Sequence, residues 1–141
     1  MAAKQHLDQL RHQIEQLRNW LEPVAWSAGQ VIFRHGDPGS SLYLVTRGRA
    51  SVHLRHDDEG IRLVTFAPGA VFGELALLDR GPRSATITAD EDLTGFGLGE
   101  ASFATLCQKQ PDIAIKLLSA LGRELSVRIR YANITIQQLE T

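Results

Sequence analysis

The segment from Phe72 to Thr86 has the sequence FGELALLDRGPRSAT. It lies in a part of the chain rich in glycine and β-branched residues, yet residues 75–78 have the pattern of a single helical turn. Gly73 allows the backbone to approach a ligand closely, and the amides after it are the unsatisfied donors of a helix start. Such donors favour an anion.

Two charged residues narrow the kind of ligand that this segment predicts. Arg83 follows a Gly-Pro turn, where its guanidinium can bind two oxygens of one phosphate in a fork. Glu74 would repel a phosphate, but its carboxylate accepts hydrogen bonds from hydroxyl groups such as those of a ribose. The segment therefore predicts a small ligand that carries both a phosphate and a ribose hydroxyl.

The sequence around this segment, from Trp26 to Leu98, indicates strands. Short β-branched or aromatic runs alternate with turns rich in glycine, proline and aspartate, at a spacing of roughly 8–12 residues that favours an antiparallel sandwich or barrel. No long helix separates the runs, which argues against a doubly wound parallel sheet. The predicted strands are Val31–Phe33, Leu42–Val45, Ala50–Leu54, Leu63–Phe66 and Ala85–Ala89.

Helices are expected at both ends of the chain. Between Met1 and Glu22, apolar residues at alternating spacings of three and four predict an amphipathic helix that ends at Pro23. This stripe lasts about two heptads, which favours docking onto the neighbouring domain over self-association. After Ala101, Pro111 separates a short helix from a long one. The distal half of the long helix would extend beyond so small a domain unless it folds back or pairs.

Composition excludes several classes of protein. A chain of 141 residues suits one domain with an appendage. Its net charge of -1 lacks the basic excess of a protein that neutralises nucleic-acid phosphates, so no direct nucleic-acid contact is expected. No apolar run approaches the roughly 18 residues of a membrane span. We expect a cytoplasmic protein, or the cytoplasmic part of a membrane protein, that does not itself insert into the membrane.

Neither a metal site nor catalysis is indicated. The only cysteine is Cys107, so no internal disulfide can form, and the five histidines lack metal-binding spacing with acidic partners. No serine lies in a nucleophile motif. The sequence therefore predicts a binding module and not an enzyme.

The segment from Phe72 to Thr86 resembles the phosphate-binding cassette of the cyclic nucleotide-binding domain family. That family has the pattern Phe-Gly-Glu-Leu/Ile-Ala-Leu, a short gap, and then Arg-Ser/Ala/Thr-Ala. Gly36-Asp37, residues 42–45 and Gly48 also look like the family's turn and strand positions, and the resemblance extends over about residues 28–120.

The resemblance implies a mainly β fold with flanking helices (α+β). Its centre is an antiparallel, jelly-roll-like β-roll, also called a double-stranded β-helix. On this basis we expect an N-terminal helix at 1–22 and a cyclic nucleotide-binding domain at 23–141. Within that domain, the β-roll would occupy about 26–99 and the C-terminal lid helices about 100–139.

The resemblance also implies roles for individual residues. Glu74 would accept a hydrogen bond from the ribose 2′-hydroxyl, and Arg83 would pair with the cyclic phosphate, or with Glu74 in an empty site. The other candidate ligand-binding residues are Gly73, Leu75, Ala76, Ser84 and Ala85 around the phosphate, and Val64 and Val71 against the base. The two valines can equally be plain core residues.

The function implied is that of a regulatory sensor. Cyclic AMP is favoured over cyclic GMP as the ligand, because the chain looks most like bacterial members. Movement of the C-terminal helix would signal to an attached or partner effector such as a transporter, channel or enzyme. A truncated sensor half of a catabolite activator-type transcription factor, and a ligand-free interaction module that retains the fold, are the alternatives. A homodimer through the terminal helices also stays open.

Overall fold

The computed structural model describes residue 12 and residues 15–53 and 62–140. Most of the helix expected at 1–22 lies outside these residues, as does Leu54 of the predicted strand 50–54. The chain divides into two compact units, residues 1–104 and residues 105–141, which are described separately below.

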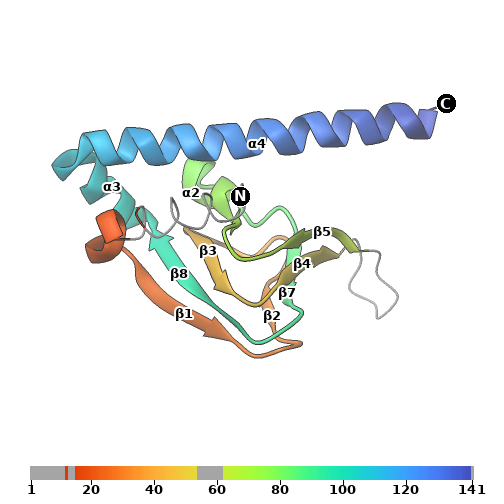
Figure 1. The fold of residues 1–141 in the computed structure, drawn as a ribbon, viewed down its shortest axis with the longest axis horizontal. Coiled ribbons are helices and arrows are strands. Elements are labelled where there is room, and N and C mark those ends of the chain that lie inside the picture. Colours follow the sequence, from red (N-terminus) through yellow and green to blue (C-terminus); the bar gives the residue numbers. More distant parts are fainter. Residues whose placement is uncertain (1–11, 13–14, 54–61, 141) are drawn as a thin grey trace. The chain divides into compact units, whose positions relative to one another are not determined.

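The first unit is built on two four-stranded antiparallel sheets, with strand orders β1-β8-β3-β6 and β2-β7-β4-β5 (Figure 1). This arrangement confirms the predicted β-roll. A short helix, α2 (Glu74–Asp79), connects the two sheets between β6 and β7. The strands are β1 (Glu22–Trp26), β2 (Val31–Phe33), β3 (Ser41–Arg47), β4 (Ala50–His53), β5 (Arg62–Phe66), β6 (Val71–Phe72), β7 (Thr86–Ala89) and β8 (Leu93–Gly99).

The core of the roll is formed by the side chains on one face of each sheet, because successive side chains along a strand point to opposite faces. Each large apolar side chain removed from water here contributes roughly 1.5–3 kcal/mol of burial free energy. The rings of Trp26, Phe33 and Tyr43 pack against this core while staying partly exposed. The buried members are Val45, Ala50, Phe66, Phe72, Ile87, Ala89 and Leu93.

The structure corrects the expectation that a helix runs to Glu22 and ends at Pro23. A 3-10 turn, η1 (Arg18–Trp20), is followed by β1, which begins at Glu22 and contains Pro23. Strand β1 is the edge strand of its sheet and pairs only with β8, so the missing amide hydrogen of proline is tolerated there.

Two further strands, β6 and β8, were not among the predicted ones. Strand β8 carries Gly95, Gly97 and Gly99, which weaken its strand signal. A Cβ at Gly95 would overlap the carbonyl oxygen of Leu44 on the neighbouring strand β3, so a side chain there would push the two strands apart. Strand β6 has only two residues, Val71 and Phe72, too few for any periodicity.

Helix α3 (Glu100–Lys109) follows β8 directly, and α4 (Pro111–Glu140) follows it. Pro111 stands at the first position of α4, where its fixed φ suits a helix and its missing amide hydrogen costs nothing. The predicted break between a short and a long helix is confirmed. At 30 residues, α4 is roughly 45 Å long.

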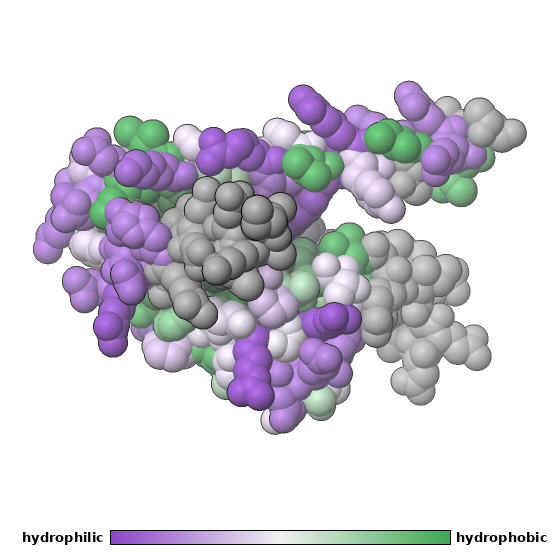
Figure 2. All heavy atoms as spheres, viewed as in Figure 1, coloured by the Kyte–Doolittle hydropathy of each residue, from purple (hydrophilic) through white to green (hydrophobic). Residues whose placement is uncertain are grey.

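Several apolar side chains interrupt the polar surface of α4 (Figure 2). The most exposed of them are Ile115, Val127, Ile129, Tyr131, Ile134 and Leu139. Among the described residues, no helix is both long enough and apolar enough to cross a membrane.

Candidate ligand site

The backbone around α2 takes a shape that few residues allow. Gly73 caps the N-terminus of α2 with φ 76° and ψ 11°, a left-handed conformation that favours glycine. At the other end, Arg80 is also left-handed, with φ 59°. The single helical turn predicted at 75–78 is thus present, and a left-handed residue flanks it on each side.

Arg83 is anchored by its own backbone to the turn that follows β2. Its amide donates to the carbonyl oxygen of Asp37 over 2.8 Å, and the amide of Gly36 donates to the carbonyl oxygen of Arg83, also over 2.8 Å. These two backbone hydrogen bonds hold residue 83 beside residues 36–37 independently of the contacts of its side chain.

The side chain of Arg83 is buried, with only 5% of its surface exposed. Its Nη1 donates to the carbonyl oxygen of Ser41 over 2.8 Å and to that of Gly73 over 3.1 Å. Its Cζ lies 4.1 Å from the centre of the Phe33 ring and 5.6 Å from that of Tyr43. The guanidinium therefore joins β2, β3 and the start of α2.

The charge of Arg83 is incompletely matched in this structure. Within the described residues, Arg83 forms no ion pair with a carboxylate, and its buried Nε has no hydrogen-bond partner. Burial lowers the pKa of Arg83, while Tyr43 and Asp37 nearby oppose that shift. A buried donor without an acceptor is rare because it costs free energy. A negatively charged acceptor beside Nε would satisfy both this donor and the charge.

Glu74 and Ala76 lie close to the guanidinium in sequence and are buried like it. Glu74, the first residue of α2, is 5% exposed, and Ala76 is 2% exposed. Because Gly73 contacts Arg83 directly and Glu74 follows Gly73, the structure brings the two charged residues of the cassette to the same end of α2.

The other predicted site residues are more open. Leu75 and Val64 are each 42% exposed, Ser84 is exposed, and Ala85 and Val71 are half-buried. Val64 lies on β5 opposite Val52, and Val71 lies on β6 opposite Leu44. The two valines thus belong to different sheets of the roll. The exposure of Val64 argues against a plain core role for it.

Sequence analysis missed the residues that hold Arg83. Phe33 and Tyr43 are predicted only as strand residues. Ser41, which lies 42 residues before Arg83 and binds it, falls in no predicted strand. A carbonyl oxygen carries no sequence signal, because every residue has one. The aromatic side chains at 33 and 43 gave no hint beyond strand propensity.

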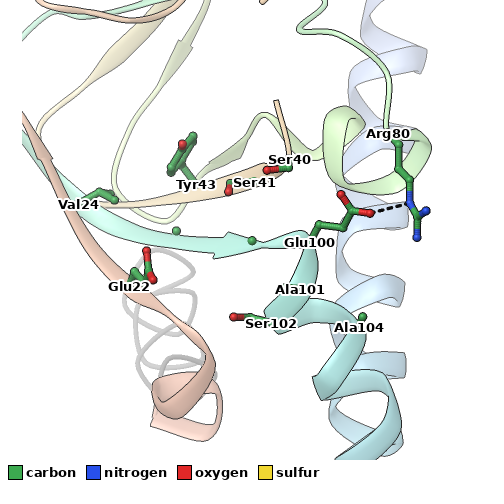
Figure 3. Close-up of a pocket in the computed structure, with 12 residues that line it drawn as sticks. Glu22, Val24, Ser40, Ser41, Tyr43, Arg80, Glu100, Ala101, Ser102 and Ala104 are labelled. Atoms are coloured by element: carbon green, nitrogen blue, oxygen red, sulfur yellow. Dashed lines mark ion pairs between the residues drawn. The ribbon is translucent and has the colours of Figure 1, made fainter. Parts of the chain in front are cut away.

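A separate cavity of about 590 Å³ opens in the first unit between β1, β3, β8 and the start of α3 (Figure 3). At its edge Arg80 Nε pairs with Glu100 Oε1 over 2.9 Å. None of the predicted site residues lines this cavity, but Ser41 and Tyr43 do. Among the residues that the structure describes, no group of three or more histidine, cysteine or acidic side chains is placed to hold a metal ion.

Comparison with known proteins supplies a family for this arrangement. The family described as "Cyclic nucleotide-binding domain" matches residues 23–110, which include both the Gly73 turn and Arg83. The chain is also similar to a solved cyclic nucleotide-binding domain from Methylobacillus flagellatus. The TM-score is 0.77 at 25% identity, over 84% of this chain and 67% of that one.

Two relatives show how such domains are used elsewhere. A "CRP-like cAMP-activated global transcriptional regulator" of Mycobacterium tuberculosis is 30% identical over 113 residues, which cover 79% of this chain and 50% of that protein. A cyclic nucleotide-gated potassium channel of Mesorhizobium japonicum is 40% identical over 87 residues, which cover 62% of this chain and 23% of the channel. The chain thus spans half or less of these relatives.

Proposed function

Because this chain belongs to the cyclic nucleotide-binding domain family, we propose that it is a regulatory sensor module that binds one cyclic nucleotide at residues 73–85. The observation that carries this proposal is Arg83, a buried cation with no carboxylate partner among the described residues and a buried Nε that lacks an acceptor. A cyclic phosphate would supply both a negative charge and acceptor oxygens.

The residue roles follow from the position of Arg83. Its guanidinium would bind the cyclic phosphate, together with the backbone amides around Gly73, Leu75 and Ala76 and with Ser84 and Ala85. Glu74 would accept a hydrogen bond from the ribose 2′-hydroxyl. Val64 would cover the base, because a valine that is 42% exposed can bury apolar surface when a ligand binds. Val71, which is half-buried, is a second candidate for that wall.

We favour cyclic AMP as the ligand. Support comes from the Mycobacterium relative, which is described as cAMP-activated. Cyclic GMP is the competing ligand, since a hydroxyl at Ser84 suits either nucleotide. We expect the module itself to be non-catalytic and to work in the cytoplasm.

The output of the sensor would pass through the C-terminal helices to an attached or separate effector. A ligand shifts such an equilibrium only by the difference in its affinity for the two conformations. The described relatives act as a transcriptional regulator and as a channel, so both kinds of effector remain candidates for this chain.

A second copy of the chain is the partner that α4 favours. Its sequence carries a heptad pattern that Gly122 at an a position and Ala132 at a d position interrupt. The other a positions, 115, 129 and 136, are isoleucine, and the other d positions, 118, 125 and 139, are leucine. Isoleucine at a with leucine at d favours a parallel two-stranded coiled coil. The side chains of Ile115, Ile129 and Leu139 are more than half exposed, at 61%, 60% and 82%.

The pairing is tested by replacing Ile129 with Asp. Sedimentation of the unsubstituted chain should give a dimer and that of Ile129→Asp a monomer. The control is Ser126→Asp, an exposed position beside the seam. A monomer for the unsubstituted chain at high micromolar concentration would exclude the pairing.

The sensor proposal is tested by calorimetric titration with cyclic AMP and cyclic GMP, in parallel with Arg83→Ala. One nucleotide should bind, and the substitution should weaken it by about 2–5 kcal/mol, the usual effect of truncating one partner of a buried charge pair. If the folded, unsubstituted chain binds neither nucleotide, the module is an interaction domain that retains only the fold.

A further inference from the structure

The guanidinium of Arg83 lies in a slot whose walls come from outside the cassette. On one face, the Phe33 ring centre is 4.1 Å from Cζ. Gly39 also lies against the guanidinium, so close that a Cβ there would overlap Nε and would lie 2.5 Å from Cζ. Along the Nη1 edge, a Cβ at Gly73 would lie 2.6 Å from Nη1. An aromatic ring and two glycines thus shape the slot.

We propose that Phe33 and Gly39 are positioning residues that fix the guanidinium of Arg83 in the orientation in which it binds the phosphate. This inference rests on the proposed function. It adds two residues that lie far from the cassette in sequence, and neither is required to touch the ligand.

The physical argument begins with the cation–π contact. A guanidinium over an aromatic face is attracted by the ring quadrupole, most strongly where water is excluded, as it is around this 5% exposed side chain. An arginine side chain has considerable rotamer freedom, and immobilising it during binding would weaken affinity. The ring sets the plane of the guanidinium, and the two bonds from Nη1 set its rotation within that plane. Arg83 is therefore already ordered before a ligand arrives.

Gly39 serves this slot by having no side chain, and not through an unusual backbone. Gly36 and Gly73 have positive φ angles of 86° and 76°, whereas Gly39 is not among the positive-φ glycines. Alanine at 39 is thus free of backbone strain, and its Cβ would act only by displacing the guanidinium.

The first experiment needs no nucleotide. In the ligand-free chain, the Arg83 Nε–Hε resonance is measured by ¹⁵N–¹H NMR and assigned by its loss in Arg83→Lys. We expect the ring current of Phe33 to move Hε from its usual position. That displacement should disappear in Phe33→Leu and persist in Phe33→Tyr. Phe96→Leu is the matched control, because Phe96 is also a half-buried phenylalanine. Its neighbour Gly97 faces Tyr43, and successive residues of a strand point to opposite faces, so Phe96 points away from Tyr43. A resonance unchanged by Phe33→Leu would overturn the proposal.

The second experiment is a calorimetric titration with cyclic AMP and cyclic GMP. Phe33→Leu should weaken binding about tenfold, as expected for a desolvated cation–π contact. Phe33→Tyr and Phe96→Leu should stay within about twofold of the unsubstituted chain. Gly39→Ala should weaken binding at least as much as Phe33→Leu does. The thermal unfolding midpoint of Gly39→Ala should stay that of the unsubstituted chain. In an Arg83→Ala background, Phe33→Leu should change the remaining affinity by less than about twofold.

The double substitution separates positioning from a general structural role. If Phe33 had only a structural role, Phe33→Leu would weaken binding equally in the unsubstituted chain and in Arg83→Ala. That result would overturn the proposal. If the unsubstituted chain bound neither nucleotide, the proposed function would fail instead. The NMR comparison would then decide by itself whether the Phe33 ring lies against the guanidinium in the ligand-free chain.

Discussion

Replacing Arg83 with methionine should weaken binding of the cyclic nucleotide by about 2–5 kcal/mol while leaving the ligand-free protein about as stable as before. Methionine matches arginine in reach but carries no charge. The substitution removes the Nη1 bonds to Ser41 and Gly73 and the contact with Phe33. Hydrogen bonds from a charged group contribute about 1.5–3 kcal/mol each, and a desolvated cation–π contact about 2 kcal/mol.

An opposing contribution nearly balances these losses. Burying an ion costs several kcal/mol, and here no carboxylate of the described residues offsets that cost. A flexible methionine also packs well against the Phe33 ring. We therefore expect the free energy of unfolding without ligand to change by less than about 2 kcal/mol, in line with buried charges replaced by apolar residues.

The assay is thermal unfolding with and without nucleotide. At a ligand concentration of 100 Kd, binding stabilises a folded protein by about 2.7 kcal/mol. For a domain of this size that free energy raises the midpoint by roughly 10 °C. The unsubstituted chain should show this rise, and Arg83→Met should show about a third of it or less, because a binding loss of about 2 kcal/mol or more leaves under about 0.9 kcal/mol of stabilisation. A ligand-free midpoint lowered by more than about 7 °C in Arg83→Met would refute the reasoning, because that shift corresponds to more than about 2 kcal/mol and would make Arg83 a structural residue.

Other substitutions test separate parts of the structure. Glu74→Gln should weaken the cyclic nucleotide roughly tenfold or more, because the ribose hydroxyl loses a charged acceptor; in calorimetry, the 2′-deoxy analogue should bind both proteins about equally. Leu93→Ala should lower the free energy of unfolding in urea by about 2–5 kcal/mol, since Leu93 is 1% exposed in the core. Arg80→Ala should lower it by less than about 1 kcal/mol, since the Arg80 and Glu100 side chains are 75% and 40% exposed.

Much of the fold follows from patterns that are local in sequence. The strands at 31–33, 41–47 and 86–89 show as short β-branched or aromatic runs bounded by turn residues, and Pro111 marks the start of α4. The cassette is local too, because Gly73, α2 and Arg83 fall within one short segment. The conformations of such segments are limited by interactions between residues that are close in sequence, so the sequence can indicate them.

Strands β1 and β8 required the tertiary structure. Pro23 and the glycines of β8 read as strand breakers, yet β1 tolerates proline as an edge strand and β8 needs a glycine at 95 where the backbone of β3 comes close. Whether a residue breaks a strand depends on which neighbour it faces, and that neighbour is set by the order of strands in the sheet.

The sequence alone determined that an arginine and a glutamate flank a glycine-led helical turn, and hence which chemical groups a ligand should offer. Only the tertiary structure decided how that arginine is held. Phe33, Gly39 and Ser41 reach Arg83 because the turn after β2 pairs with residue 83 and β3 runs beside β6. The contacts are a ring face, an absent side chain and a carbonyl oxygen. None of these leaves a pattern in the sequence, because each acts through position in space and not through spacing along the chain.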